Sequence, residues 1–185
     1  MKVVLLSDPA SAHTIKWANG IHSKGVDVLV YGLTACDYSQ YNSGIEIEIF
    51  KIPEFFKWQK DGNILKAVYL LSLPRLKKMI KKFQSDILHS QSASSYGLLG
   101  ALSGFHPHVM SVWGNDVYIF PHKHKFLEKI LRYNLSTADI ITSSSKIMAD
   151  YSRRFVDKDI LVTPGGIMLD KFKPMKRDTS IYQEN

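Results

Sequence analysis

The fold is decided by residues 2–31, which read KVVLLSDPASAHTIKWANGIHSKGVDVLVY. The apolar run at residues 2–7 predicts a strand, and apolar residues at helical spacing over 12–24 predict a helix that stops at Gly25. A second apolar run at residues 26–31 predicts another strand. A strand, a helix and a strand in this order form a right-handed crossover, which makes the two strands parallel in one sheet.

The same alternation continues to residue 163. It predicts strands at residues 45–50, 86–89, 109–113, 139–142 and 160–163. It predicts helices at residues 63–83, 96–103, 126–135 and 145–154, and Pro74 should kink the first of these or divide it in two. We therefore expect residues 1–163 to form a Rossmann-like, three-layer α/β/α domain with a mainly parallel sheet. Ligands of such sheets bind beyond the carboxyl ends of the strands.

The composition limits the class of protein. The 185 residues fit one domain, and a hydrophobic content of 45% supports a sizeable core. The single cysteine, Cys36, excludes a disulfide framework and a cysteine zinc site. No apolar run is long enough for a signal peptide or a membrane span, so we expect a cytoplasmic protein, soluble or peripheral to the membrane. The net charge of +7 favours anionic partners.

Three segments, taken together, resemble one family of enzymes. They are residues 7–18, 111–117 and 162–174. Their order resembles the N-terminal half of the GT-B glycosyltransferases of family 4, which includes enzymes that build capsule, lipopolysaccharide and other bacterial surface glycans. The hinge of that family commonly reads Pro-Asn-Gly-Val-Asp, followed by a Phe and a Pro. Residues 164–168 read Pro-Gly-Gly-Ile-Met in the same frame, and Phe172 and Pro174 follow.

The resemblance implies an enzyme divided into two halves. Residues 1–163 would be the acceptor side, and residues 164–185 a hinge or linker toward a C-terminal domain that this chain lacks. The full-length enzyme would transfer a sugar from a nucleotide sugar, with retention, to a glycan or lipid-linked acceptor in surface polysaccharide biosynthesis. The missing domain would hold most of the donor, no cofactor or metal would be needed, and the isolated chain would be inactive. The alternative is a non-catalytic α/β module for ligand binding or regulation.

The first candidate site residues follow the first strand. Ser11 and His13 lie where a helix begins, and the small side chains of residues 9–12 allow a ligand to approach closely. These residues do not form a glycine-rich fingerprint, which disfavours a nicotinamide site. The resemblance implies that Ser11 and His13 contact the acceptor, and the alternative for His13 is a capping or surface role.

The second group is the expected polar turn at residues 113–116, Trp-Gly-Asn-Asp. Family members often carry a histidine where this chain has Trp113, and an indole cannot act as a base. The acceptor side would therefore use Trp113, Gly114 and Asn115 for binding, and Asp116 would orient or deprotonate the acceptor hydroxyl as the catalytic residue. The structural alternative for Asp116 is a helix cap.

Further candidates follow other strands. By resemblance Ser144 faces the cleft, and the polar residues 89–92 lie on the same rim. Gly165 and Gly166 form the donor-side hinge, whose closure would bring donor and acceptor together.

Two basic clusters and four histidines complete the set. The histidines at 106, 108, 122 and 124 have extended spacing, with no cysteine or acidic ligand at a recognised interval. Neighbouring lysines oppose a cation, so we expect no metal site. The basic clusters are Arg75, Lys77, Lys78, Lys81 and Lys82, and then Lys123, Lys125, Lys129 and Arg132. They lie on helices beside aliphatic stripes, which favours an anionic membrane surface or plain solvation over nucleic acid.

Overall fold

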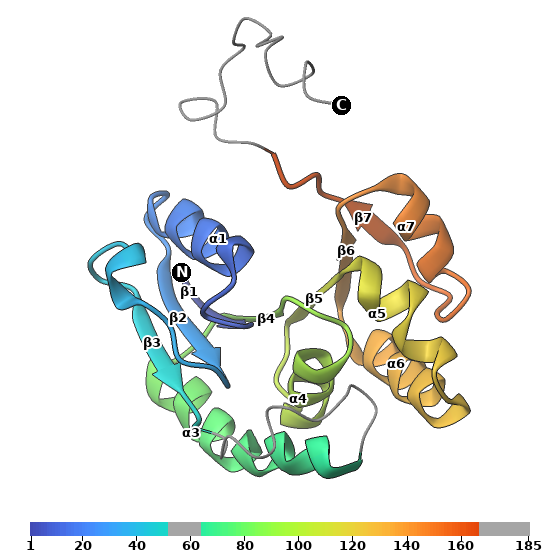
Figure 1. The fold of residues 1–185 in the computed structure, drawn as a ribbon. Coiled ribbons are helices and arrows are strands. Elements are labelled where there is room, and N and C mark those ends of the chain that lie inside the picture. The colour runs from blue at the N-terminus through green and yellow to red at the C-terminus, as the bar shows by residue number, and fades with distance from the viewer. Residues whose placement is uncertain (52–63, 167–185) are drawn as a thin grey trace, which may run out of the picture.

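The computed structural model describes residues 1–51 and 64–166, and these form a twisted sheet flanked by helices (Figure 1). Within the described residues, seven strands run parallel in the order β3-β2-β1-β4-β5-β6-β7. The strands are β1 (Lys2–Leu6), β2 (Asp27–Gly32), β3 (Glu46–Ile49), β4 (Ile87–Ser90), β5 (His108–Val112), β6 (Ile140–Ser143) and β7 (Ile160–Val162). The predicted parallel α/β sheet is confirmed.

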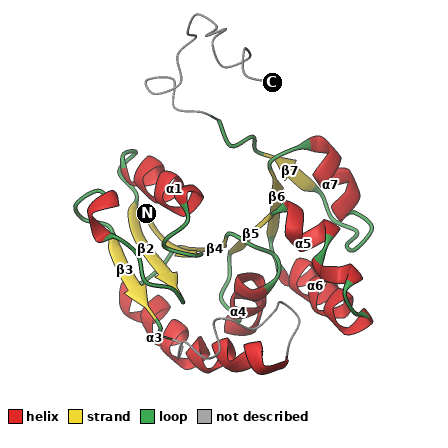
Figure 2. Ribbon diagram, viewed as in Figure 1, coloured by secondary structure: helices red, strands yellow, loops and turns green. Residues whose placement is uncertain are grey.

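Helices connect the strands and lie on both sides of the sheet (Figure 2). The α-helices are α1 (Ala12–His22), α3 (Leu73–Phe83), α4 (Ser95–Ser103), α5 (Gly114–Tyr118), α6 (Lys125–Thr137) and α7 (Lys146–Ser152). The 3₁₀-helices of the described residues are η1 (Tyr38–Gln40), η2 (Ile64–Ser72) and η3 (Phe120–His122). The three-layer arrangement follows from the strands, because a parallel strand buried on both faces needs a helix on each side.

The alternation of side chains along β1 shows how the layers form. Val3 and Leu5 pack with Ala18 of α1 on one face of the sheet. Val4 and Leu6 point to the other face, where they pack with buried residues of α3 and α4. Farther along that face, β5, β6 and β7 pack against α5, α6 and α7. The core therefore lies in two layers, and the carboxyl ends of the strands share one edge.

The long helix predicted around Pro74 is divided, as expected. The chain is 3₁₀ up to Ser72 and α-helical from Leu73, with Pro74 in the first turn of α3. Proline fits this place, because its missing N–H is not needed in the first turn of a helix. The prediction was wrong at residues 114–116, which form the first turn of α5 and not a free turn. A five-residue helix is too short for its periodicity to show in the sequence.

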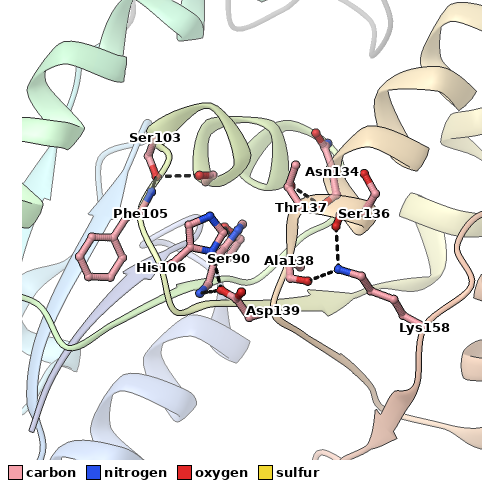
Figure 3. Close-up of polar contacts among 12 residues, drawn as sticks. Ser90, Ser103, Phe105, His106, Asn134, Ser136, Thr137, Ala138, Asp139 and Lys158 are labelled. Carbon is pink, nitrogen blue, oxygen red and sulfur yellow. Dashed lines mark hydrogen bonds and ion pairs between the residues drawn. The ribbon is translucent and has the colours of Figure 1, made fainter.

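The opposite, amino edge of β5 and β6 is fixed by polar contacts, drawn in Figure 3. The carboxylate of Asp139 accepts a 2.6 Å hydrogen bond from the backbone N–H of His108, and it lies 2.7 Å from Nδ1 of His106. Lys158 donates to the carbonyls of Ser136 and Ala138, each at 2.6 Å, at the end of α6. His106 and His108 thus hold the start of β5.

A close approach between α4 and the sheet requires Gly100. A Cβ atom built there would lie 2.4 Å from Oγ of Ser90 and 2.5 Å from Nε2 of His108. Both neighbours are buried and are joined by a 2.8 Å hydrogen bond, so neither can move without breaking it. A methyl group at this position must therefore displace α4 from β4 and β5.

We expect Gly100→Ala to lower the free energy of unfolding by about 1–3 kcal/mol, measured by denaturant titration. Gly20→Ala is the matched control, because Gly20 also lies in a helix but has no atom near the added methyl group. It should leave stability unchanged or raise it by about 0.5–1 kcal/mol. Equal stability of the Gly100 variant and the wild type would contradict the packing described here.

Candidate functional site

The loop after β1 is fixed by its own side chains. Asp8 accepts hydrogen bonds from the backbone N–H of Ala10, at 3.0 Å, and from the hydroxyl of Thr34. Ser11 caps α1 and accepts a 3.3 Å hydrogen bond from the backbone N–H of His13. The loop also lies tightly on β2, because a Cβ atom at Gly32 would lie 2.2 Å from Pro9. The predicted acceptor residue Ser11 thus shapes the loop, and His13 is exposed beside it.

Asp116 links the ends of β4 and β5. Its carboxylate accepts hydrogen bonds from the backbone N–H of Ala93 at 2.8 Å, from the backbone N–H of Trp113 at 3.1 Å and from the hydroxyl of Ser92 at 3.0 Å. The side chain is buried, with 4% of its surface exposed. Burial raises the pKa of this carboxyl group, and the hydrogen bonds that it accepts oppose that shift.

These contacts give Asp116 a positioning role at the start of α5. Its hydrogen bond from Trp113 is the carboxylate half of a capping box, in which a side chain in the first turn reaches back to the N-cap amide. The loop at residues 92–94 is held from its other side by Asn134 of α6, whose amide donates to the carbonyls of Ala93 and Ser94. The catalytic role predicted for Asp116 stays a prediction.

Two aromatic contacts join α1 to the rest of the carboxyl edge. The rings of His13 and Trp113 lie edge to face with centroids 4.6 Å apart. One turn along α1, Trp17 meets His89 of β4 in the same way at 5.7 Å. The structure therefore brings the predicted residues of the first and second loops together, although 100 positions separate them in the sequence.

Polar groups without partners lie beside these rings. Among the described residues, no hydrogen-bond partner is present for the indole N–H of Trp113 or for either end of the Gln91 amide, and all of these atoms are buried. Burying such groups unpaired is costly, so the hydrogen-bonding capacity of each is unmatched within the described residues. The sequence predicted that Gln91 lies on the rim of the cleft, because it is a polar residue that directly follows β4. The pattern does not show that the side chain is buried.

The remaining predicted residues lie at the same edge. Gly114 and Asn115 open α5, and Asn115 is exposed. Ser144 is exposed after β6, and Ser145 is the serine that caps α7, by accepting a 3.2 Å hydrogen bond from the backbone N–H of Met148.

Lys16 fixes the segment that follows β7. Its Nζ atom donates to the carbonyls of Gly165 and Gly166. Gly166 has a φ of +55°, a conformation that favours glycine. The sequence did not point to Lys16, because its partners lie about 150 positions away. The predicted hinge residues are thus the last described ones, and no contact tests hinge motion. The part of the linker at residues 167–185 lies outside the described residues.

No metal site or membrane span is seen in the described part of the chain. Across residues 1–51 and 64–166, no three histidine, cysteine or acidic side chains gather in a group that could hold a metal ion. In the same residues, no helix combines the length and the hydropathy that crossing a bilayer requires.

Two buried histidines make the fold sensitive to acid. Burial lowers the pKa of His89 to about 4, with the charge of His108 adding to the shift. Burial also lowers the pKa of His108 to about 4, against the opposing charge of Asp139. Nε2 of His89 hydrogen-bonds Oγ of Ser111 at 2.8 Å, in a chain that continues to Thr142. Both rings are therefore neutral in the folded protein near neutral pH.

The predicted consequence is a loss of stability as the pH falls from about 6.5 toward 4. In this window the unfolded chain binds protons on both histidines and the folded chain does not, so each contributes a slope of about 1.4 kcal/mol per pH unit. His89→Gln keeps the hydrogen bond to Ser111 and should reduce the slope by one proton, measured by denaturant unfolding at several pH values. Between pH 7.5 and 9 the slopes of variant and wild type should agree. An unchanged acid slope would show that His89 is not buried as described.

The positioning role of Asp116 predicts a graded loss of stability. Asp116→Ala leaves two backbone N–H groups unpaired and should lower the free energy of unfolding by about 1–3 kcal/mol. Asp116→Asn keeps an oxygen for those amides and should lose less. Asp150→Ala is the control: its carboxylate pairs with Arg153 on an exposed face, and its loss should cost less than about 0.5 kcal/mol. Equal values for the two alanine variants would contradict this account.

Comparison with known proteins agrees with this geometry. Residues 2–145 match the family described as glycosyl transferase 4-like. The Bacillus subtilis (strain 168) protein TuaC, named as a candidate teichuronic acid biosynthesis glycosyltransferase, is 22% identical over 125 residues. The matched part covers 66% of this chain and 31% of TuaC, so the chain spans about a third of that relative.

Solved structures show the same fold. Sucrose-phosphate synthase from Thermosynechococcus elongatus superposes with a TM-score of 0.74 and 15% identity, over 95% of this chain and 50% of that one. HepE from Anabaena, solved in complex with UDP, gives a TM-score of 0.65 and 13% identity, over 92% of this chain and 45% of that one. MurG from Acinetobacter baumannii gives a TM-score of 0.52 and 12% identity, over 88% of this chain and 44% of that one. The chain thus spans half or less of each of these proteins.

The family match runs from β1 to the residues just after β6, and so includes both loops that meet at the carboxyl edge. The chain belongs to the glycosyl transferase 4-like family and has the fold of the N-terminal domain of a GT-B glycosyltransferase.

Proposed function

We propose that this chain is the acceptor-binding half of a retaining glycosyltransferase. The full-length enzyme would transfer a sugar from a nucleotide sugar to a glycan or lipid-linked hydroxyl in surface polysaccharide biosynthesis, at the cytoplasmic face of the membrane. The name of TuaC, which refers to teichuronic acid biosynthesis, supports the polysaccharide part of the proposal. The UDP in the HepE structure supports a nucleotide-linked donor.

The observation that carries the proposal is the contact between His13 and Trp113. It joins the loops after β1 and β5 at the carboxyl edge, where ligands of open α/β sheets bind. A tryptophan ring supplies a large apolar face with one N–H donor, and a sugar ring offers apolar C–H faces with hydroxyls around them. The exposed Asn115 after β5 and Ser144 after β6 add polar groups at the same edge for those hydroxyls.

The role proposed for each residue follows from its contacts. His13 and Trp113 bind the acceptor, and Ser11 fixes the loop that carries His13. Asp116 sets the position of Trp113 by accepting its backbone N–H, and in the proposal it influences transfer through that position. A base for the acceptor hydroxyl, and most contacts to the donor, would come from the other half of the enzyme, which its relatives contain in addition to this fold.

Acceptor binding tests the proposal directly. Oligosaccharide acceptors are titrated into the 185-residue chain, followed by calorimetry, together with UDP as a donor fragment. We expect an acceptor to bind, UDP to bind far more weakly, and Trp113→Ala to weaken acceptor binding by about tenfold, which is ~1.4 kcal/mol.

Tyr133→Ala serves as the control, because Tyr133 is an exposed aromatic residue of α6 and belongs to none of the loops at the carboxyl edge. It should bind the acceptor as the wild type does. Circular dichroism of each variant separates a lost contact from a lost fold. Equal binding by the Trp113 and Tyr133 variants, or sugar transfer by this chain alone, would contradict the proposal.

A further inference from the structure

Helix α3 carries a one-sided positive charge. Its eleven residues include five basic side chains and no acidic one. Leu76, Ile80 and Phe83 are buried against the sheet. The basic residues are all exposed and form what we call the basic face of α3: Arg75, Lys77, Lys78, Lys81 and Lys82. The apolar stripe holds the helix on the sheet, and among the described residues the basic side chains lie outside that packed stripe.

Within residues 1–51 and 64–166, an ionic partner is seen for one of these five basic side chains. Arg75 pairs with Glu48 at the end of β3. Across the described residues, no carboxylate lies within ion-pair distance of the four lysines. The second basic cluster, on α6, differs in this respect, because Glu128 lies within it and pairs with Arg132 at 2.8 Å. The basic face of α3 therefore has the more concentrated field.

An exposed apolar side chain extends the basic face. Leu71, at the end of η2, is 67% exposed and lies four positions before Arg75. This end of α3 adjoins the carboxyl ends of the strands, because the carbonyl of Ser72 accepts a 3.0 Å hydrogen bond from Tyr31 of β2. At the other end, Phe83 lies under the ammonium group of Lys2 at the start of β1. Helix α3 thus runs from the carboxyl end of β2 to the start of β1, along the outside of the molecule (Figure 1).

We propose that the basic face of α3, together with Leu71, docks on an anionic lipid bilayer. Lysines attract acidic headgroups from outside the bilayer, and an adjacent apolar side chain can enter the interface. Docking in this way holds the carboxyl edge of the sheet beside the membrane. Docking would give the enzyme access to a lipid-linked acceptor, and this part of the inference rests on the proposed function. The binding to the bilayer depends only on the basic face of α3 and on Leu71.

The arrangement fits a bilayer better than a nucleic acid. Single-stranded nucleic acids bind where aromatic side chains are interleaved with basic ones and stack on bases. The exposed residues of α3 include no aromatic side chain, and the apolar residue beside them is an aliphatic one. Nucleic acid binding is therefore the competing outcome in the test.

Vesicle sedimentation with the 185-residue chain tests the docking. We expect binding to vesicles of phosphatidylcholine with 30% phosphatidylglycerol, little binding to phosphatidylcholine alone, and weakening as salt is raised. Each lysine should contribute about fivefold, so the variant K77Q/K78Q/K81Q/K82Q should bind ~600-fold more weakly. The control K24Q/K123Q/K125Q/K129Q removes four exposed lysines elsewhere and should bind within about threefold of the wild type.

A second pair of variants tests the apolar contact. Leu71→Ser should weaken vesicle binding about fivefold or more, and Leu161→Ser, at an exposed leucine of β7, should not. Equal binding by the two quadruple variants, or no need for acidic lipid, would overturn the proposal. Tighter binding of the wild type to a 20-nucleotide DNA strand than to the acidic vesicles would overturn it in favour of nucleic acid. Vesicle binding involves no sugar, so failure here leaves the acceptor-binding proposal to its own test.

Discussion

The hydrogen bonds to the buried carboxylate of Asp116 are the constraint on which the carboxyl edge depends. One side chain holds the amide of Ala93 after β4 and the amide of Trp113 after β5, and so fixes two loops relative to each other. The position of Trp113 in turn decides where it meets His13, which lies in the first turn of α1 directly after the loop that follows β1. Three strand ends are thereby fixed around one pair of rings. A carboxylate accepts several N–H groups at once, which no neutral side chain of this size does as well.

The rest of the fold is stabilised by packing on the faces of the sheet and not at its carboxyl edge. The buried apolar residues of the sheet pack against α1 on one face and against α3, α4, α6 and α7 on the other. Close packing at Gly100 brings α4 onto β4 and β5, and the buried pair of Ser90 and His108 lies beneath it. Polar contacts at the amino edge, from Asp139 and Lys158, fix the other ends of β5 and β6. The loops at the carboxyl edge are then fixed by a few contacts of their own, chiefly the hydrogen bonds to Asp116 and the contact between His13 and Trp113.

Much of this could be predicted from the sequence, for identifiable reasons. Strands such as β1 and helices such as α6 were predicted because apolar spacing records which face is buried. The edge that carries the site followed from the parallel sheet. Side-chain contacts could not be predicted, because the contact of His13 with Trp113 and that of Lys16 with Gly165 join residues far apart in the chain. The same limit explains Asp116: a residue after a strand can be a cap or a base, and only its neighbours show that it is buried and fully engaged.

The central claim is that the acceptor binds where the loops after β1, β4 and β5 meet. The most direct measurement is a map of amide chemical shifts of the ¹⁵N-labelled chain during titration with an acceptor oligosaccharide. The largest changes should fall at residues 11–13, 91–93 and 113–116, with the indole N–H of Trp113 among them. Changes confined to the amino edge, or to α6 and α7 away from these loops, would contradict it.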